Sequence, residues 1–141
     1  SLNLVWHRLK PWPDSVRGLK RLKSKFVIGT LSNGNTSLLV NMAKFGGLPW
    51  DCVFSSDTFN LFKPDPGMYL GAADRLDLKP SEVMMVAAHS DDLREAASNG
   101  LRTAHVARPG ENGPGTGESA PRVPVDFAAK NMEDLARQLG V

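Results

Sequence analysis

Polar and charged side chains follow three apolar stretches of the chain, at intervals of about 30 residues. Ser32 and Asn33 come directly after the first stretch, Lys63 follows the second, and Asp92 follows the third. Hydroxyl, amide and backbone N–H groups can bind a carboxylate or phosphate oxygen, and an ammonium group can stabilise a nearby carboxylate. A second carboxylate can pair with that ammonium or activate water. The residue types therefore indicate a site that binds an anion and could support hydrolysis.

Each of these residues also has a structural interpretation when it is taken alone. The turn at Ser32 could be a helix cap, and Lys63 could be a solvated loop lysine. Tyr69 could place its hydroxyl in the same pocket as Lys63, or it could be a packing residue. His89 could carry a proton or form a polar wall, and a lone histidine is more often structural. Asp92 could cap a helix.

The elements that must position these residues alternate between strands and helices. We expect strands at 26–31, 52–54, 83–87, 101–106 and 127–128. We expect Asp14 or Ser15 to cap a helix, and we expect further helices at 36–45, 66–76, 91–99 and 132–139. This order predicts an α/β fold with a doubly wound parallel sheet, a Rossmann-like core with helices on both faces.

The ligand site of such a sheet lies beyond the carboxyl ends of its strands. Ser32, Asn33 and residues 89–92 all follow expected strands, so the sheet would bring them together. Residues 108–122 are rich in Gly and Pro, and we expect them to form a surface loop.

Composition narrows the classes of function. A chain of 141 residues suits one domain, and a hydrophobic content of 41% with a net charge of +2 is ordinary for a globular protein. Basic residues are scattered among acids, so we expect no nucleic-acid partner, and no apolar run has the roughly 18 residues of a membrane span. The single cysteine, Cys52, favours a reducing cytoplasm and a core role rather than a nucleophilic one.

Three motifs, in this order and at this spacing, resemble the haloacid dehalogenase superfamily, and most closely its 2-haloacid dehalogenase (type II) branch. They are Leu31-Ser32-Asn33-Gly34-Asn35, Lys63-Pro64-Asp65-Pro66 and Val86-Ala87-Ala88-His89-Ser90-Asp91-Asp92. The family's first motif, a strand ending in an Asp-x-x-x-Thr loop that supplies the nucleophile, is not among these residues.

The resemblance therefore implies the C-terminal portion of a hydrolase, without the cap domain and the first strand. Residues 1–13 resemble the end of the helical cap and its hinge, and 14–141 resemble the C-terminal part of the core. Since the chain opens on Ser1 rather than Met, we expect a trimmed or cleaved start. We expect these residues alone to be inactive and their sheet to lack a central strand.

The resemblance also implies a role for each candidate residue. Ser32 would hold the substrate carboxylate, and Asn33 would help to form the pocket for the halide or the carboxylate. Lys63 and Asp92 would form a charged pair around the nucleophile and the water. We also expect His89 to be catalytic and Tyr69 to bind the substrate.

Two alanines distinguish the branches of the superfamily. Related phosphatases carry Gly-Asp where this chain has Ala87-Ala88, and a methyl group cannot bind magnesium. We therefore expect no metal and no cofactor. Ala87 stands where related dehalogenases often carry Ser, and His89 where they often carry Asn, which bears on substrate range.

Three hypotheses remain open at this stage. The first is hydrolytic dehalogenation of a small 2-haloacid to the 2-hydroxy acid, through an aspartyl ester. The second is a magnesium-dependent phosphatase-like hydrolase that uses Asp91 and Asp92, and the third is a non-catalytic remnant of the fold. The expected partner is a small haloacid, and a homodimer is one open assembly.

Overall fold

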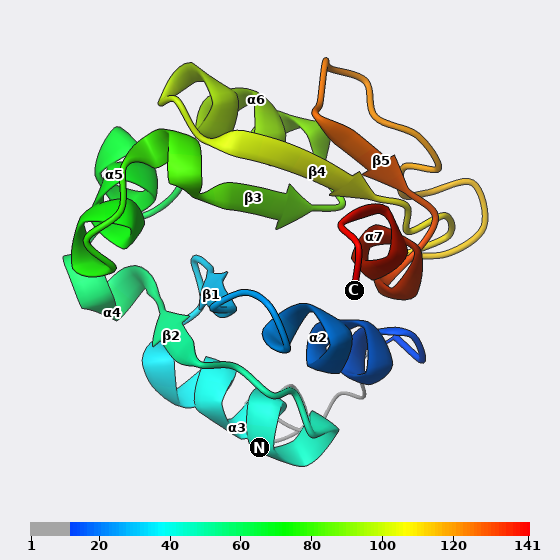
Figure 1. Ribbon diagram of the computed structural model, residues 1–141, viewed down its shortest axis with the longest axis horizontal. Helices are drawn as coiled ribbons and strands as arrows, with labels where there is room; N and C mark the ends of the chain where they lie inside the picture. The colour runs from blue at the N-terminus through cyan, green and yellow to red at the C-terminus, as the bar shows by residue number, and fades with distance from the viewer. Residues whose placement is uncertain (1–11) are drawn as a thin grey trace.

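The computed structural model describes residues 12–141 (Figure 1). The helix end expected at 2–9, and with it nearly all of the expected cap and hinge, lies outside the described residues. The elements follow in the order α2 (Ser15–Lys23), β1 (Gly29–Leu31), α3 (Thr36–Gly46), β2 (Cys52–Phe54), α4 (Ser56–Phe59), α5 (Pro66–Arg75), the 3-10 turn η1 (Pro80–Glu82), β3 (Met84–Ala87), α6 (Ser90–Ser98), β4 (Arg102–Val106), β5 (Phe127–Ala129) and α7 (Met132–Gln138).

All pairings between the strands are parallel, as predicted, but the strands form two sheets rather than one. β1 pairs with β2, with Gly29 opposite Cys52, and β3, β4 and β5 form a second sheet in that order. Figure 1 shows β1 and β3 facing each other across the middle of the molecule. Within residues 12–141, β1 pairs only with β2 and β3 pairs only with β4, so no strand pairs with the edges of β1 and β3 that face each other.

Helices cover both faces of the larger sheet. On one face, α2 and α7 pack against β4 and β5 through a cluster that contains Leu19, Ala104 and Leu135. On the other face, a second cluster joins α5 and α6 to β3 and includes Tyr69 and Leu93. The expected α/β fold with helices on both faces is therefore confirmed.

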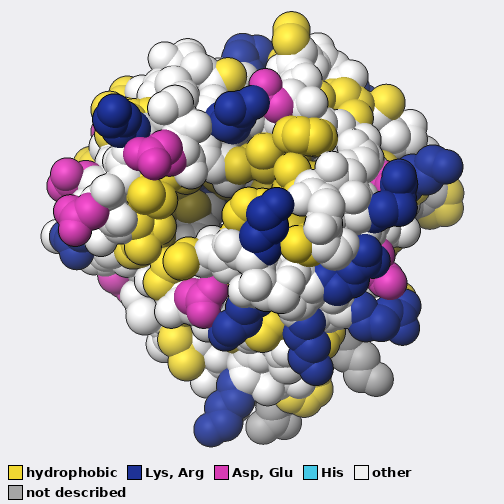
Figure 2. Space-filling model, viewed as in Figure 1, with side chains coloured by type: hydrophobic (Ala, Val, Ile, Leu, Met, Phe, Trp, Pro, Cys, Tyr) yellow, Lys and Arg dark blue, Asp and Glu magenta, His cyan; other side chains and the backbone are white. Residues whose placement is uncertain are grey.

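The smaller sheet is covered less completely. The helix α3 has an apolar sequence, yet none of its 11 residues is buried, and Val40 and Phe45 are 46% and 52% exposed. Figure 2 shows hydrophobic side chains around a hollow over the middle of the molecule, whereas Lys and Arg side chains are spread over much of the rest of this face.

The helix boundaries follow from local chemistry. The Asn35 side chain caps α3 by accepting from the backbone N–H of Leu38 at 2.9 Å, and Gly47 ends this helix with φ of 69°. Asp65 caps α5, which has Pro66 at its first position, because proline lacks the N–H that this position leaves free.

Two expectations about local structure were wrong, and one short helix was not expected. Asp14 precedes α2 but makes no side-chain cap there, because its carboxylate accepts from Arg108 and from the backbone N–H of Met132 instead. The strand expected at 26–31 begins only at Gly29, since the backbone N–H of Phe26 still donates to Leu22. The short helix α4, capped by Ser55, had no apolar periodicity to reveal it.

None of the helices within 12–141 combines the length and apolarity that crossing a membrane requires.

Candidate active site

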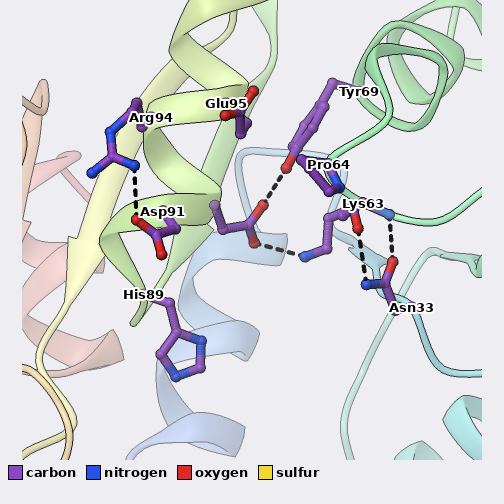
Figure 3. A pocket seen from close by; sticks show the side chains of 9 residues that line it. Asn33, Lys63, Pro64, Tyr69, His89, Asp91, Arg94 and Glu95 are labelled. Atoms are coloured by element: carbon purple, nitrogen blue, oxygen red, sulfur yellow. Dashed lines mark hydrogen bonds and ion pairs between the residues drawn. The ribbon is translucent and has the colours of Figure 1, made fainter.

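Asn33 joins the loop after β1 to the loop that carries Lys63. Its side-chain amide donates to the carbonyl oxygen of Lys63 at 3.3 Å, and its Oδ1 accepts from the backbone N–H of Lys63 at 2.5 Å. This two-point contact, visible in Figure 3, fixes the backbone of Lys63 against the end of β1. Asn33 therefore holds the site together as well as facing its cavity.

Asp92 accepts two short hydrogen bonds, one on each carboxylate oxygen. Lys63 Nζ lies 2.6 Å from Asp92 Oδ2, and the Tyr69 hydroxyl donates to Asp92 Oδ1 at 2.6 Å. The Lys63 and Asp92 side chains are 19% and 16% exposed, and Tyr69 is fully buried. The three groups come from the loop before α5, from α5 and from α6, so their meeting is a product of the fold (Figure 3).

Tyr69 acts as a hydrogen-bond donor because its environment keeps it protonated. Burial raises the pKa of the Tyr69 hydroxyl far above its usual range, and the negative charges of Asp92 and Glu95 raise it further. Tyr69 therefore serves to orient the Asp92 carboxylate, while Lys63 supplies the compensating positive charge.

These groups open onto a cavity of about 580 Å³. Five of the six predicted site residues line it, together with residues that were not predicted; the lining set is Asn33, Lys63, Pro64, Tyr69, His89, Asp91, Asp92, Arg94 and Glu95. Ser32 is not among the lining side chains. Its hydroxyl accepts from the backbone N–H of Gly34 at 3.0 Å, so it shapes the turn that presents Asn33.

His89 lies at the rim of the cavity rather than beside the Lys63–Asp92 pair. Its side chain is 62% exposed, points away from that pair in Figure 3, and places Nε2 2.8 Å from Glu111 Oε2. Glu111 belongs to the Gly- and Pro-rich loop at 108–122, for which the sequence predicts only a surface position.

Asp91 and Asp92 are neighbours in sequence but face different ways. The Asp91 side chain is 88% exposed and accepts from Arg94 Nη1 at 2.8 Å, whereas Asp92 faces Lys63. Among residues 12–141, no three His, Cys, Asp or Glu side chains are grouped closely enough to hold a metal ion.

Helical spacing could have found one of the residues that sequence reasoning missed. Glu95 lies three residues after Asp92 on α6, so both must project from the same face of the helix. No comparable signal marks Glu111, because it reaches His89 from a loop without periodicity.

The lysine–carboxylate pair and its cavity lie after the carboxyl ends of parallel strands, which is where α/β folds bind their ligands. A family model described as haloacid dehalogenase-like hydrolase matches residues 1–100. The chain therefore belongs to the haloacid dehalogenase-like hydrolase family, and its resemblance to the 2-haloacid dehalogenase branch is confirmed.

Individual relatives agree with this assignment. (S)-2-haloacid dehalogenase 1 from Pseudomonas sp. (strain CBS-3) is 38% identical over 107 residues, which cover 74% of this chain and 47% of that protein. A crystal structure of a defluorinating L-2-haloacid dehalogenase is 50% identical with a TM-score of 0.92, over 96% of this chain and 56% of that one.

A third relative is the L-2-haloacid dehalogenase from Xanthobacter autotrophicus, with chloropropionic acid covalently bound. It is 26% identical with a TM-score of 0.79, over 95% of this chain and 62% of that one. The chain spans about half the length of the curated relatives it matches.

Proposed function

We propose that the protein carrying this chain hydrolyses a small 2-haloacid to the corresponding 2-hydroxy acid. The observation that carries the proposal is the Asp92 carboxylate, which is held at 2.6 Å by both Lys63 and Tyr69 at the edge of a cavity. The named relatives are 2-haloacid dehalogenases, and their similarity extends over most of this chain.

In the proposed mechanism, an aspartate outside these 141 residues attacks the carbon that carries the halogen. A C–O bond forms, the C–halogen bond breaks, and halide leaves with its electron pair. Water then attacks the carbonyl carbon of the aspartyl ester, releasing the 2-hydroxy acid, the free aspartate and one proton. The covalently bound chloropropionic acid in the Xanthobacter autotrophicus relative supports a covalent step.

The strand bearing this aspartate would lie between β1 and β3. The facing edges of these two strands support that placement, because within residues 12–141 neither edge has a strand partner. An aspartate at the carboxyl end of such a strand would stand between Asn33 and Asp92, beside the cavity.

The residues of this chain then have distinct roles. Lys63 neutralises negative charge on the nucleophile, and Asp92, oriented by Tyr69, accepts a proton from the attacking water. Ser32, with the backbone N–H groups of its turn, holds the substrate carboxylate, and Asn33 helps to form the pocket for the halide or the carboxylate. His89 borders the entrance for substrate and halide.

We propose no metal or cofactor for this reaction. Ala88 offers no oxygen ligand, and the Asp91 carboxylate is 88% exposed and paired with Arg94. Cytoplasmic location and assembly as a homodimer are also proposals. The location is favoured by the single cysteine, and size-exclusion chromatography with light scattering tests the assembly.

The test is halide release by the full-length protein, with and without a chelator. 2-Chloropropionate is the first substrate, and fluoroacetate belongs in the panel because one solved relative is described as defluorinating. We expect halide and 2-hydroxy acid in equal amounts in the presence of chelator. Magnesium-dependent hydrolysis of a phosphomonoester, without halide release, would support the phosphatase hypothesis instead. Neither activity would support the non-catalytic remnant.

A further inference from the structure

The first turn of α6 is held by a carboxylate from a distant loop. Glu118 Oε2 accepts from the backbone N–H of Ser90 at 3.0 Å, and Glu118 Oε1 accepts from the Ser90 hydroxyl. The N-cap residue of α6, His89, makes no side-chain cap hydrogen bond. Glu118 therefore takes over the capping of this helix from 28 residues away.

The contact is enclosed and charged. Ser90 is 3% exposed, the Glu118 side chain is 13% exposed, and the buried His105 places Nε2 3.2 Å from Glu118 Oε1. Burial alone would raise the pKa of the Glu118 carboxyl, but the hydrogen bonds from Ser90 and His105 outweigh it and lower the pKa below its usual value. Glu118 thus carries a negative charge at neutral pH, which suits the positive end of the α6 dipole.

Backbone contacts fix the loop that carries Glu118. The Arg108 N–H donates to the Glu118 carbonyl at 3.0 Å, and the Arg122 N–H donates to the Ser90 hydroxyl oxygen at 2.9 Å. The loop and the start of α6 are therefore bound to each other at several points.

Two other helices receive a remote carboxylate at their first backbone N–H. Asp57 accepts from Thr36 at the start of α3, and Asp14 accepts from Met132 at the start of α7. Those helices also have side-chain caps of their own, from Asn35 and Asn131. Among these three helices of the described residues, α6 is the one whose N-cap side chain makes no capping hydrogen bond, so the remote carboxylate is its only side-chain cap.

We propose that Glu118 is a positioning residue that orients Asp92 through Ser90. Asp92 lies two residues after Ser90 in the same helical turn, and its two oxygens must meet Lys63 and Tyr69 at the same time. A shift of the first turn of α6 would move Asp92 away from one of these partners. The effect on turnover rests on the proposed function, because displacement of a catalytic group by about 1 Å can cost about 100-fold in rate.

The experiment compares Glu118→Ala and Glu118→Gln with the wild type in the full-length protein. The matched control is Glu133→Gln, a carboxylate in an exposed pair with Arg17. We expect Glu118→Ala to lower kcat by about 10- to 100-fold with KM changed less than about threefold, because Ser32 and Asn33 lie on another element. Glu118→Gln retains one acceptor oxygen, so its kcat should fall less than that of Glu118→Ala. The control variant should have the kcat and KM of the wild type.

Hydrogen exchange provides the readout that does not depend on activity. The backbone amides of residues 90–92 should exchange faster in Glu118→Ala than in the wild type, while those of α7 keep their protection. If Glu118→Ala does not fold, Glu118→Gln carries the same comparison. Either unchanged exchange at residues 90–92 or an unchanged kcat would overturn the inference.

The two proposals fail in distinguishable ways. A wild type that releases no halide contradicts the proposed function, and hydrogen exchange then decides the inference about Glu118 alone. A wild type that releases halide, with Glu118→Ala equally fast, contradicts the positioning role and leaves the proposed function intact.

Discussion

Lys63 Nζ lies 2.6 Å from Asp92 Oδ2, although 29 residues separate the two in sequence. The loop before α5 supplies the cation and the first turn of α6 supplies the anion, and Asn33 fixes the backbone of Lys63 from a third element. The pair is about four-fifths buried, so its charges are only weakly screened by solvent. It is the feature of this chain best suited to stabilising charge during a reaction.

Replacement of Lys63 should therefore abolish most activity. We expect Lys63→Ala in the full-length protein to lower kcat by about 100- to 1,000-fold, because a preorganised charge in an enclosed site is lost. Halide release under saturating substrate measures the effect. Lys20→Ala, at an exposed position on α2, is the matched control and should retain full activity. Equal loss in both variants would contradict a specific role for Lys63.

Removal of the Tyr69 hydroxyl tests how Asp92 is oriented. Tyr69→Phe keeps the buried ring but deletes the donor to Asp92 Oδ1, leaving that oxygen without this partner. Hydrogen bonds to charged groups contribute about 1.5–3 kcal/mol, so we expect a loss of about that size in the free energy of unfolding. Urea denaturation measures this free energy. A variant as stable as the wild type would show that the hydrogen bond from Tyr69 to Asp92 contributes nothing to stability.

The stability of the chain should depend on pH through Asp14. Burial acts to raise the pKa of the Asp14 carboxyl, but the Met132 N–H and the Arg108 guanidinium outweigh it and hold the pKa below the usual 3.8. Since the folded pKa is depressed, the stabilisation is present above about pH 4 and is lost as pH falls through the folded value.

The variant Asp14→Asn isolates this contribution. We expect it to be about 3 kcal/mol less stable than the wild type at pH 7, the lower end of the cost of breaking a buried ion pair, because Arg108 loses its ionic partner. The difference between the two proteins should narrow as pH falls below about 4, because the unfolded chain then takes up a proton, and it should vanish once the folded carboxylate is protonated as well. Thermal unfolding at a series of pH values measures this difference in stability. A difference that stays constant into acid would contradict the role of the Asp14 carboxylate.

Isolated residues 1–141 should be poorly stable or should associate. Within the described part, the edges of β1 and β3 that face each other have no strand partner, and α3 buries none of its residues. Unpaired strand edges are costly or promote association. Sedimentation and thermal unfolding of the isolated chain measure both properties. A monomer with a sharp transition at high temperature would show that the two sheets need no further strand.

Most of the fold could be predicted from sequence, because the apolar periodicity of helices and strands and the Gly and Pro residues that end them are local signals. The strands at Cys52–Phe54 and Met84–Ala87, and α5 with its first proline, follow from such signals. The start of β1 could not be predicted, since Phe26 and Val27 are apolar yet 39% and 66% exposed. Their exposure depends on tertiary packing rather than on local pattern.

The site residues that belong to motifs after strands could be predicted from sequence. The residues that reach the site from distant loops could not. Asn33 follows β1, Lys63 follows β2 and α4, and Asp92 lies in the first turn of α6 after β3, and the three line one cavity. Glu118 reaches Ser90 from a loop whose composition indicates only a turn-rich surface, so nothing local marks its role. Whether Ser32 and His89 contact substrate stays a prediction.

A single turnover in ¹⁸O-labelled water tests the central claim most directly. 2-Chloropropionate is mixed with an excess of the full-length protein in labelled water. The masses of the lactate and of the protein are then determined by mass spectrometry. If an aspartyl ester forms, the hydroxyl oxygen of the lactate comes from the aspartate, so the product is unlabelled and the protein gains the heavy oxygen. Labelled lactate from unlabelled protein would mean that water displaces the halide directly, and absence of lactate would contradict the proposed dehalogenation altogether.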